Sequence, residues 1–239
     1  MGFLDRIQQA KQNSKKLLAV LIDPDKFQND ENALLVRQMK KTPPDILLVG
    51  GSLLSDYLNE TVSFLKKHFT IPVFLFPGNV IQISSEADGI LFMSLISGRN
   101  PEFLIGQQVV AAPLLKKTHL EIIPTGYILL ENGKTTSVEY MSNTKPIPQD
   151  KQDIILATAL AGQYLGQQLI YLETGSGANH TVSQILIESL SEKLNIPIIA
   201  GGGIRNAKDL KAIYNAGADM AVVGTVIEEN PEILSTLIR

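Results

Sequence analysis

The sequence predicts a single-domain α/β barrel with eight strands, and three observations support this fold class. Short apolar runs alternate with longer segments of helical periodicity, which is typical of repeated βα units around a parallel sheet. The chain has 239 residues, close to the roughly 250 residues of one such barrel. Its last two apolar runs end directly in glycine, at Gly201 and Gly224. We therefore expect residues 1–239 to form one TIM-type (β/α)8 barrel.

The expected elements cover the whole chain. The N-terminal segment has charges scattered through it and no apolar core, which predicts an amphipathic helix rather than a signal peptide. The expected strands are residues 17–22, 45–49, 72–76, 89–93, 121–130, 168–172, 197–200 and 220–223. The expected helices between and after them are residues 31–41, 53–68, 150–164, 181–194, 207–216 and 226–238.

Two of the expected βα units are irregular. The third strand is followed by residues 78–87, a segment that is short for a helix, so we expect a loop with one turn there. The fifth strand is followed by Asn132-Gly133 between two alternating segments, which is typical of a β-hairpin. We expect this hairpin insertion to lie over the barrel mouth.

Composition limits the class of protein. Lysine and arginine total 21 against 24 acidic residues, for a net charge of -3, so no basic excess points to nucleic acid or to an anionic membrane surface. The absence of cysteine excludes disulfides, thiolate nucleophiles and cysteine metal sites. No segment reaches the ~18 uninterrupted apolar residues of a membrane span. We expect a cytoplasmic protein and, because barrels often pair, a homo-oligomer.

Glycines after the last two strands predict a phosphate site. Gly201 to Gly203 follow the seventh strand, and Gly224-Thr225 follow the eighth. In barrels, the loops after these two strands frequently bind phosphate, and glycine lets a ligand approach backbone N–H groups. Tight turns are the competing explanation, but three consecutive glycines lose more backbone entropy than a turn requires.

The segment after the sixth strand combines a carboxylate with more glycine. Tyr171 and Glu173 are two residues apart, so on one strand they share a face, and residues 174–179 form a glycine-rich loop that is able to surround a phosphate. If this face is the barrel interior, Glu173 is well placed as a general base. In the alternative, Glu173 is exposed at a strand end and the glycines only make a turn. We expect His180 to lie near a helix start rather than to act in catalysis.

Oxygen ligands for a metal follow the first two strands. Asp23 and Asp25 flank a proline, and Ser52 follows Gly50-Gly51. Mg²⁺ prefers hard oxygen ligands and often shares them with substrate phosphates. An Asp-Pro-Asp turn with a helix cap, and an N-cap role for Ser52, are the structural alternatives.

The segment after the fourth strand supplies a cation and apolar surface. Arg99 either binds a second anionic group or makes a surface salt bridge. The apolar residues around it admit a long apolar ligand at the mouth, although many of them belong to the barrel core: Phe92, Met93, Leu95, Ile96, Phe103 and Leu104.

Six motifs together point to a known family. LIDPDK, VGGS, SLISGRNP, YLETGSGANH, IIAGGGIR and AVVGT occur in this order and span essentially the full length. In this order they closely resemble the geranylgeranylglyceryl phosphate synthase family, which includes bacterial heptaprenylglyceryl phosphate synthases. The resemblance implies a Mg²⁺-dependent prenyltransferase on a TIM barrel. In that reaction the primary hydroxyl of sn-glycerol 1-phosphate attacks C1 of a prenyl diphosphate, with geranylgeranyl diphosphate as the expected donor.

The resemblance also implies site residues. Asp23 and Ser52 are the implied Mg²⁺ ligands, and Glu173 is the implied base, with Tyr171 beside it. The implied glycerol phosphate site comprises Tyr171, Leu172, Glu173, Thr174, Gly175, Ser176, Gly177, Gly202, Gly203, Gly224 and Thr225. One position departs from the family, since some members have a lysine where this chain has Leu21. Arg205 or Lys26 is a candidate to replace its phosphate contact.

Two other functions remain open at this point. A sugar-phosphate isomerase would use only the phosphate site and would not depend on Mg²⁺. A non-catalytic barrel would bind a phosphate metabolite without turning it over. The DDxxD motif of helical prenyl synthases is absent from the sequence, which argues against that architecture.

Overall fold

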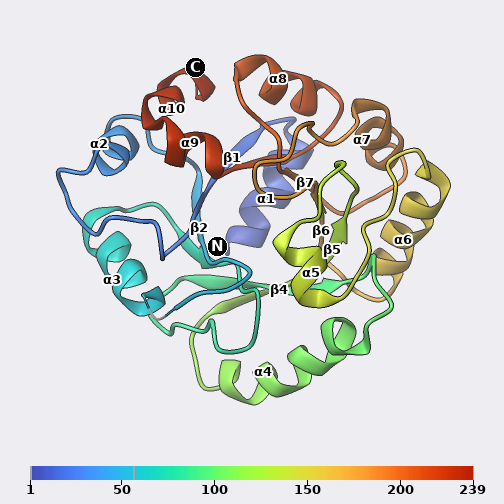
Figure 1. Ribbon diagram of the computed structural model, residues 1–239, viewed down its shortest axis with the longest axis horizontal. Coiled ribbons are helices and arrows are strands. Elements are labelled where there is room, and N and C mark those ends of the chain that lie inside the picture. The colour runs from blue at the N-terminus through green and yellow to red at the C-terminus, as the bar shows by residue number, and fades with distance from the viewer. Residues whose placement is uncertain (1, 56, 239) are drawn as a thin grey trace.

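Eight parallel strands close into a barrel in sequence order, as Figure 1 shows in a view down its mouth. The computed structural model describes residues 2–55 and 57–238. The strands are β1 Leu17–Ile22, β2 Ile46–Val49, β3 Val73–Leu75, β4 Gly89–Leu95, β5 Glu121–Leu129, β6 Leu169–Glu173, β7 Ile198–Gly201 and β8 Met220–Val223. The predicted barrel is therefore confirmed, with strand ends within two residues of those expected from the sequence.

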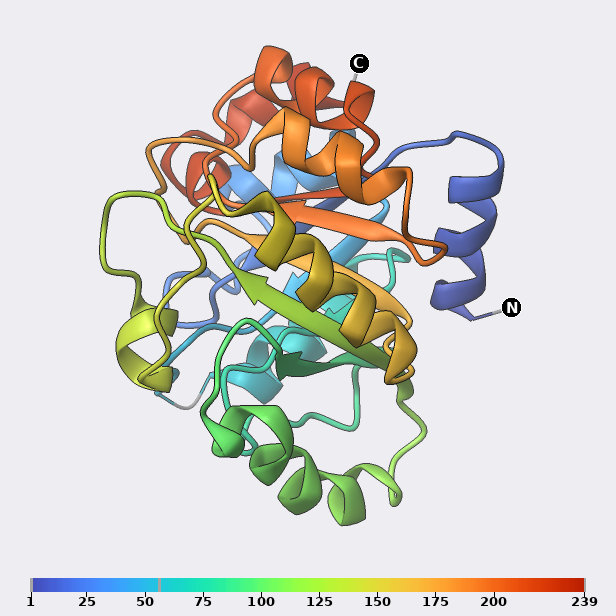
Figure 2. The same cartoon turned by 90° about the vertical axis from the view of Figure 1, so that its right-hand side faces the viewer.

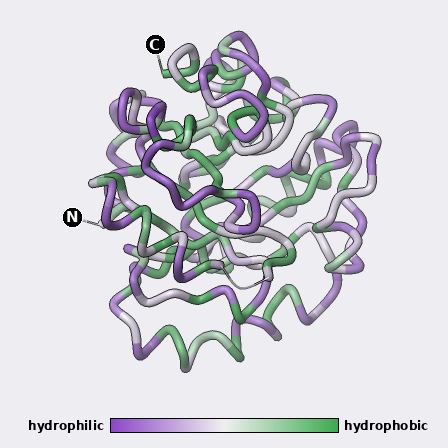
Figure 3. The backbone as a smooth tube through the Cα atoms, turned by 60° about the vertical axis from the view of Figure 1, so that its left-hand side comes forward, coloured by the Kyte–Doolittle hydropathy of each residue, from purple (hydrophilic) through white to green (hydrophobic). Residues whose placement is uncertain are grey.

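A ring of helices surrounds the strands. The helices are α1 Phe3–Gln12, α2 Leu34–Lys41, α3 Leu58–His68, the π-helix η1 Glu102–Gly106, α4 Gln107–Leu115, α5 Ser137–Ser142, α6 Gln152–Tyr164, α7 Gln184–Ser191, α8 Ala207–Asn215, α9 Thr225–Glu229, the 3₁₀ helix η2 Pro231–Ile233 and α10 Leu234–Leu237. In Figure 3, hydrophilic stretches gather on the outer helices and loops, while the strands inside are largely hydrophobic. None of the described helices is long and apolar enough to cross a membrane.

Each strand is apolar on both faces because both are covered. On β6, Leu169 and Tyr171 belong to the cluster inside the barrel, whereas Ile170 and Leu172 belong to the layer between barrel and helices. Burial on both sides explains why the strands are almost continuous apolar runs. This alternation also places Glu173 on the same inward face as Tyr171, so the face that their spacing left open is the barrel interior.

Helix α1 closes the barrel at the end opposite the mouth. Figure 2 shows it apart from the ring, beside the N-terminal ends of the strands. The Phe3 ring lies 5.1 Å from the Phe74 ring, measured between centroids. The Glu121 carboxylate accepts hydrogen bonds from the N–H groups of Phe3 at 2.7 Å and Leu4 at 2.9 Å. The predicted N-terminal helix is confirmed, and its first turn is held by a residue of β5.

The third βα unit is irregular, as predicted. In the structure, residues 76–88 contain no helix and connect β3 directly to β4. The gap between α3 and α4 in Figure 1 marks this place in the ring. The missing helix leaves one side of the barrel mouth covered only by a loop.

The predicted hairpin after β5 is wrong. Asn132-Gly133 does make a turn, with Gly133 at a φ of 81°, but the chain then forms the helix α5 instead of a second strand. The Thr136 hydroxyl caps this helix by accepting the Glu139 N–H at 3.1 Å. The helix start is a Thr-x-x-Glu pattern, which favours an N-terminus more strongly than the alternating residues favour a strand.

The predicted C-terminal helix over residues 226–238 is also wrong, because the chain forms three short helices there. Pro231 has no N–H to continue the helix, and the Asn230 side chain accepts the Glu232 N–H at 3.2 Å to begin a new turn. The other helices are shorter than predicted, since α2, α3 and α7 begin three to five residues later than expected.

Candidate active site

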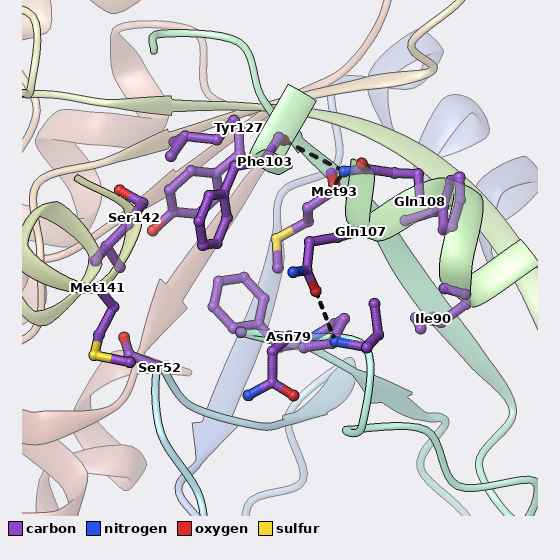
Figure 4. Close-up of a pocket in the computed structure, with 18 of the residues that line it drawn as sticks. Ser52, Asn79, Ile90, Met93, Phe103, Gln107, Gln108, Tyr127, Met141 and Ser142 are labelled. Atoms are coloured by element: carbon purple, nitrogen blue, oxygen red, sulfur yellow. Dashed lines mark hydrogen bonds between the residues drawn. The ribbon is translucent and has the colours of Figure 1, made fainter. Parts of the chain in front are cut away.

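Two adjoining cavities open at the C-terminal ends of the strands. The larger has a volume of about 1070 Å³ and is lined by polar loops after β1, β2, β5, β6, β7 and β8. The smaller, of about 120 Å³, is mainly apolar and lies between β3, β4, η1, α4 and α5 (Figure 4). The two cavities adjoin, because they share the lining residues Gly51, Ser52, Phe76, Tyr127, Val138 and Met141.

The polar cavity contains the glycines predicted from the sequence. Gly175, Gly177, Gly202 and Gly203 have φ angles of 99°, 65°, 87° and 68°, which only glycine adopts readily. At Gly203 a β-carbon would also lie 2.8 Å from the Thr181 nitrogen. These conformations bring bare backbone from two loops to one wall of the cavity.

The third loop of this wall follows β8. The hydroxyls of Ser176 and Thr225 are 2.8 Å apart, which joins the loop after β6 to the start of α9. Gly224 and Thr225 both line the cavity. We call the wall formed by residues 175–177, 202–203 and 224–225 the glycine cup. Its small residues and exposed backbone are suited to an anionic group such as phosphate.

Glu173 lies at the base of the cup with 7% of its surface exposed. Burial raises the pKa of its carboxyl from 4.5 to about 7, while the Gly175 N–H and the neighbouring Tyr171 hydroxyl oppose this rise. Glu173 Oε1 accepts the Gly175 N–H at 2.5 Å. A carboxyl with a pKa near neutrality is suited to accept a proton from a bound hydroxyl.

Tyr171 packs beside Glu173 on the inward face of β6. Its ring stacks on Tyr127 at 5.3 Å between centroids and contacts Phe76 at the same distance. The Tyr171 hydroxyl is buried and has no hydrogen-bond partner of good geometry among the described residues. It lies close enough to the Glu173 carboxylate to influence it electrostatically, and both burial and that charge raise the pKa of Tyr171. Tyr171 therefore stays a neutral donor beside the carboxylate.

Asp23 and Ser52 line the polar cavity after β1 and β2, and because β1 pairs with β8, Asp23 lies beside the β8 end of the cup. A β-carbon on Gly51, the neighbour of Ser52, would lie 3.9 Å from Asp23 Oδ1, so the loops after β1 and β2 are adjacent. Asp23 Oδ1 accepts the Asp25 N–H at 3.1 Å, and Asp23 Oδ2 pairs with Lys26 Nζ at 3.1 Å. No cluster of three or more His, Cys, Asp or Glu side chains suited to a metal occurs in the described part of the chain. A cation at Asp23 would need oxygen ligands from a substrate as well.

The apolar cavity extends from this site toward the π-helix. Phe76, Met93 and Phe103 line it, and Figure 4 shows Met93 and Phe103 pointing into it from β4 and η1. Two glutamines secure its wall. The Gln108 amide donates to the Met93 carbonyl at 2.5 Å and more weakly to Phe103, and the Gln107 carbonyl accepts the Val80 N–H at 3.2 Å. The cavity therefore has a fixed apolar lining beside the polar site.

Comparisons with known proteins agree with this geometry. A model of the PcrB family matches residues 10–239. This chain belongs to the PcrB family. It is 48% identical to the geranylgeranylglyceryl phosphate synthase of Spirosoma linguale over 97% of this chain and 93% of that protein. The synthase of the same name from Pyrococcus furiosus is 41% identical over 95% of this chain and 91% of that protein.

A solved structure of the family has the same fold. It is (S)-3-O-geranylgeranylglyceryl phosphate synthase from Thermoplasma acidophilum in complex with its substrate sn-glycerol-1-phosphate. It matches with a TM-score of 0.92 and 34% sequence identity, covering 100% of this chain and 96% of that one. The family resemblance inferred from the motifs is therefore confirmed.

Not every residue predicted for the site faces the cavities of this PcrB-family chain. Leu172 points outward into the layer under the helices, and Thr174 is buried with its hydroxyl donating to the Gly201 carbonyl at 3.3 Å. Neither side chain lines a cavity, so each can reach a ligand only through its backbone. His180 is exposed beyond the glycine loop and lines neither cavity, in line with its expected place outside the chemistry.

The predicted cations divide in the same way. Arg99 is exposed outside both cavities and donates to the Gly98 carbonyl at 2.7 Å, so it does not lie where a second anion would bind. Arg205 lines the polar cavity and donates to the Ala178 carbonyl at 3.2 Å. Lys26 and Leu21 line the same cavity. Two of the three candidate cations therefore lie at the site.

Sequence reasoning missed the contribution of α5 and of the glutamines. Val138, Met141 and Ser142 of α5 line the apolar cavity, and Gln107 and Gln108 line it from α4. Two adjacent glutamines in an otherwise apolar helix were the available signal, because polar side chains facing a core need partners.

Proposed function

We propose that this protein transfers a prenyl group from a prenyl diphosphate to the primary hydroxyl of sn-glycerol 1-phosphate, with geranylgeranyl diphosphate as the first donor to test. One observation carries the proposal: a glycine cup, a buried carboxyl with a pKa near 7 and an apolar cavity meet at one barrel mouth. An ether-forming reaction between a phosphate ester and an apolar chain needs these three parts together. The names of the relatives support the same chemistry.

The glycine cup would bind the phosphate of sn-glycerol 1-phosphate. The substrate complex of the Thermoplasma acidophilum enzyme supports this ligand class for the family. With the phosphate in the cup, the glycerol carbons extend toward Glu173, which lies at its base. The cup thus orients the hydroxyl, and orientation of two reactants is a large part of catalysis.

Glu173 would act as the general base. The primary hydroxyl oxygen forms a bond to C1 of the prenyl chain as the bond between C1 and the diphosphate oxygen breaks. The hydroxyl proton passes to the Glu173 carboxylate, and diphosphate leaves with the bonding electron pair. The Tyr171 hydroxyl, whose pKa is raised by burial and by the Glu173 charge, stays protonated beside the carboxylate.

The apolar cavity would receive the prenyl chain. Its lining by Phe76, Met93 and Phe103 excludes water from the reacting carbon and offers only weak interactions to polar substrates. Because the cavity adjoins the polar one, C1 would lie where the two meet, near Phe76 and Tyr127.

Mg²⁺ fits the oxygen ligands that follow β1 and β2. The Asp23 carboxylate and the Ser52 hydroxyl are the hard oxygen ligands that this ion prefers, and it usually shares such ligands with substrate phosphates. When bound, the ion supplies positive charge that stabilises the leaving diphosphate. Both residues line the polar cavity, so they would hold the ion within it.

A product assay tests the function. The protein is incubated with Mg²⁺, labelled sn-glycerol 1-phosphate and prenyl diphosphates of increasing length. An ether-linked product for at least one length is expected, and its absence for all lengths would overturn the proposal. Binding of glycerol phosphate without turnover would identify a binding protein. Turnover of a sugar phosphate without Mg²⁺ would identify an isomerase.

The proposal includes a homo-oligomer. The outer face of α4 exposes Ile105 just before it, then Val109, Val110 and Leu114, with 48–62% of each side chain accessible. Exposed apolar surface of this kind is typical of contact faces. Light scattering coupled to size-exclusion chromatography measures the mass directly, and a monomeric mass at micromolar concentration would contradict this part.

A further inference from the structure

Lys26 joins two neighbouring loops at the mouth of the polar cavity through two ion pairs. Its Nζ lies 3.1 Å from Asp23 Oδ2 and 3.2 Å from Glu228 Oε2. Asp23 follows β1 and Glu228 belongs to α9, which follows β8, so these pairs connect neighbouring loops of the mouth. All three side chains line the cavity. The ammonium group therefore lies on the carboxylate that the proposed function assigns to Mg²⁺.

Both oxygens of Asp23 are already engaged. The Asp25 N–H occupies Oδ1 and Lys26 occupies Oδ2. A lysine ammonium group is positively charged at neutral pH, so a divalent cation that approaches Asp23 meets a like charge 3.1 Å from its Oδ2.

The side chain is free to leave. It is 57% exposed and belongs to a loop, whereas Asp23 is only 26% exposed. A lysine side chain has four rotatable bonds, and an exposed ion pair holds it with little free energy.

We propose that Lys26 forms an ion pair with Asp23 in the free enzyme and moves to the diphosphate when Mg²⁺ and diphosphate bind together. This inference rests on the proposed function. The displaced ammonium group remains at the mouth because its loop is fixed by the pairing of Asp25 with the Ser55 N–H at 3.1 Å. Lys26 thereby makes binding of Mg²⁺ alone weak and binding of the Mg²⁺–diphosphate pair strong.

The proposal predicts that one substitution strengthens the binding of Mg²⁺ alone and weakens the binding of diphosphate in the presence of Mg²⁺. Lys26→Met keeps the length of the stem and removes the charge. Mg²⁺ alone should bind this variant about threefold more tightly, which is the size of effect expected for an exposed ion pair. Inorganic diphosphate in the presence of Mg²⁺ should bind at least about tenfold more weakly, because a charge-assisted hydrogen bond is lost.

Calorimetric titration of the whole protein with Mg²⁺, and with inorganic diphosphate at fixed Mg²⁺, measures both effects. Lys134→Met is the matched control, since Lys134 lines the same cavity but lies on the loop after β5. If Lys26→Met and Lys134→Met change the two affinities by the same factors, the effect comes from the general electrostatic potential of the cavity, and the proposal is overturned. Lys26→Arg keeps the charge and should restore the wild-type order of affinities. Circular dichroism confirms that the variants fold.

The outcome is separable from that of the proposed function. If wild-type protein makes the ether product but Lys26→Met leaves both affinities unchanged, only the role of Lys26 fails. A wild-type protein that binds no Mg²⁺ with or without diphosphate also overturns it. If no prenyl length gives product, the proposed function fails whatever the titrations show.

Discussion

Glu173→Gln is the substitution that tests the site most directly, because it removes the charge and keeps the shape. Glutamine can still accept the Gly175 N–H that bonds to Glu173 Oε1 at 2.5 Å. It cannot accept a proton, so prenyl transfer should fall by about 10²- to 10⁴-fold, the usual contribution of a general base. The affinity for sn-glycerol 1-phosphate should change little, since the glycine cup is intact.

The same substitution has a pH-dependent effect on stability that follows from burial. The folded-state pKa of Glu173 is raised from 4.5 to about 7. Below about pH 4.5 the carboxyl is neutral in the folded and in the unfolded protein, so stability is at its full value. As pH rises from 4.5 through 7 the unfolded chain ionises before the folded protein does, and this part of the stability is lost. Ionising it in the folded protein then lowers the free energy of unfolding by about 3 kcal/mol at pH 9.

Thermal unfolding of both proteins at pH 5 and pH 9 measures this effect. Wild-type protein should lose about 6–12 °C more than Glu173→Gln between the two pH values, for a chain of this length. The acid limb of kcat/KM for the wild type should lie near pH 7, because the base must be ionised in the free enzyme. Parallel pH dependence of the two unfolding temperatures would refute the buried carboxyl, and normal turnover by the variant would refute the base.

Three further substitutions test the remaining parts of the site and fold. Asp23→Asn should lower turnover at least about 100-fold and raise the Mg²⁺ concentration for half-maximal rate, with an unchanged calorimetric Kd for glycerol phosphate; an unchanged Mg²⁺ titration would contradict its role. Gly202→Ala should weaken that Kd at least about tenfold, because φ is 87° there and the new β-carbon would lie 2.8 Å from Glu173 Oε1; normal affinity would contradict the cup. Glu121→Ala should lower the unfolding temperature by about 3–6 °C through loss of the two N–H contacts to α1, whereas Glu121→Gln keeps an acceptor; equal effects of the two would contradict the capping role.

The strands were predictable because every strand of a parallel barrel is buried on both faces. Both faces of a strand such as Ile46–Val49 are buried, so the sequence is apolar throughout and ends where the loops begin. Spacing by two residues then assigned Tyr171 and Glu173 to one face. The barrel closure decided that this face is the interior, which spacing alone leaves open.

The helices were less predictable where short-range signals compete. Thr136 and Glu139 start a helix, although the turn at Asn132-Gly133 and the alternation after it favour a hairpin. Two contacts between distant segments favour the helix over the hairpin. The Asn132 amide bonds to the Thr174 carbonyl, which draws the loop over β6, and α5 then packs Val138 and Met141 against the apolar cavity. Such contacts between distant segments are absent from any local pattern.

The backbone N–H groups of the predicted glycine-rich loop are not all free to bind a ligand. The Gly175 N–H is committed to Glu173 Oε1 at 2.5 Å, and the Thr174 N–H to the Gly201 carbonyl at 3.1 Å. A backbone N–H has a single hydrogen to donate. In the proposed reaction Gly175 would therefore orient the base instead of binding phosphate, and the anion would be bound by Ser176, Gly177 and the loops after β7 and β8. The glycine-rich loop would thus serve both the phosphate and the base, because the turn that exposes its later N–H groups also holds the Glu173 carboxylate.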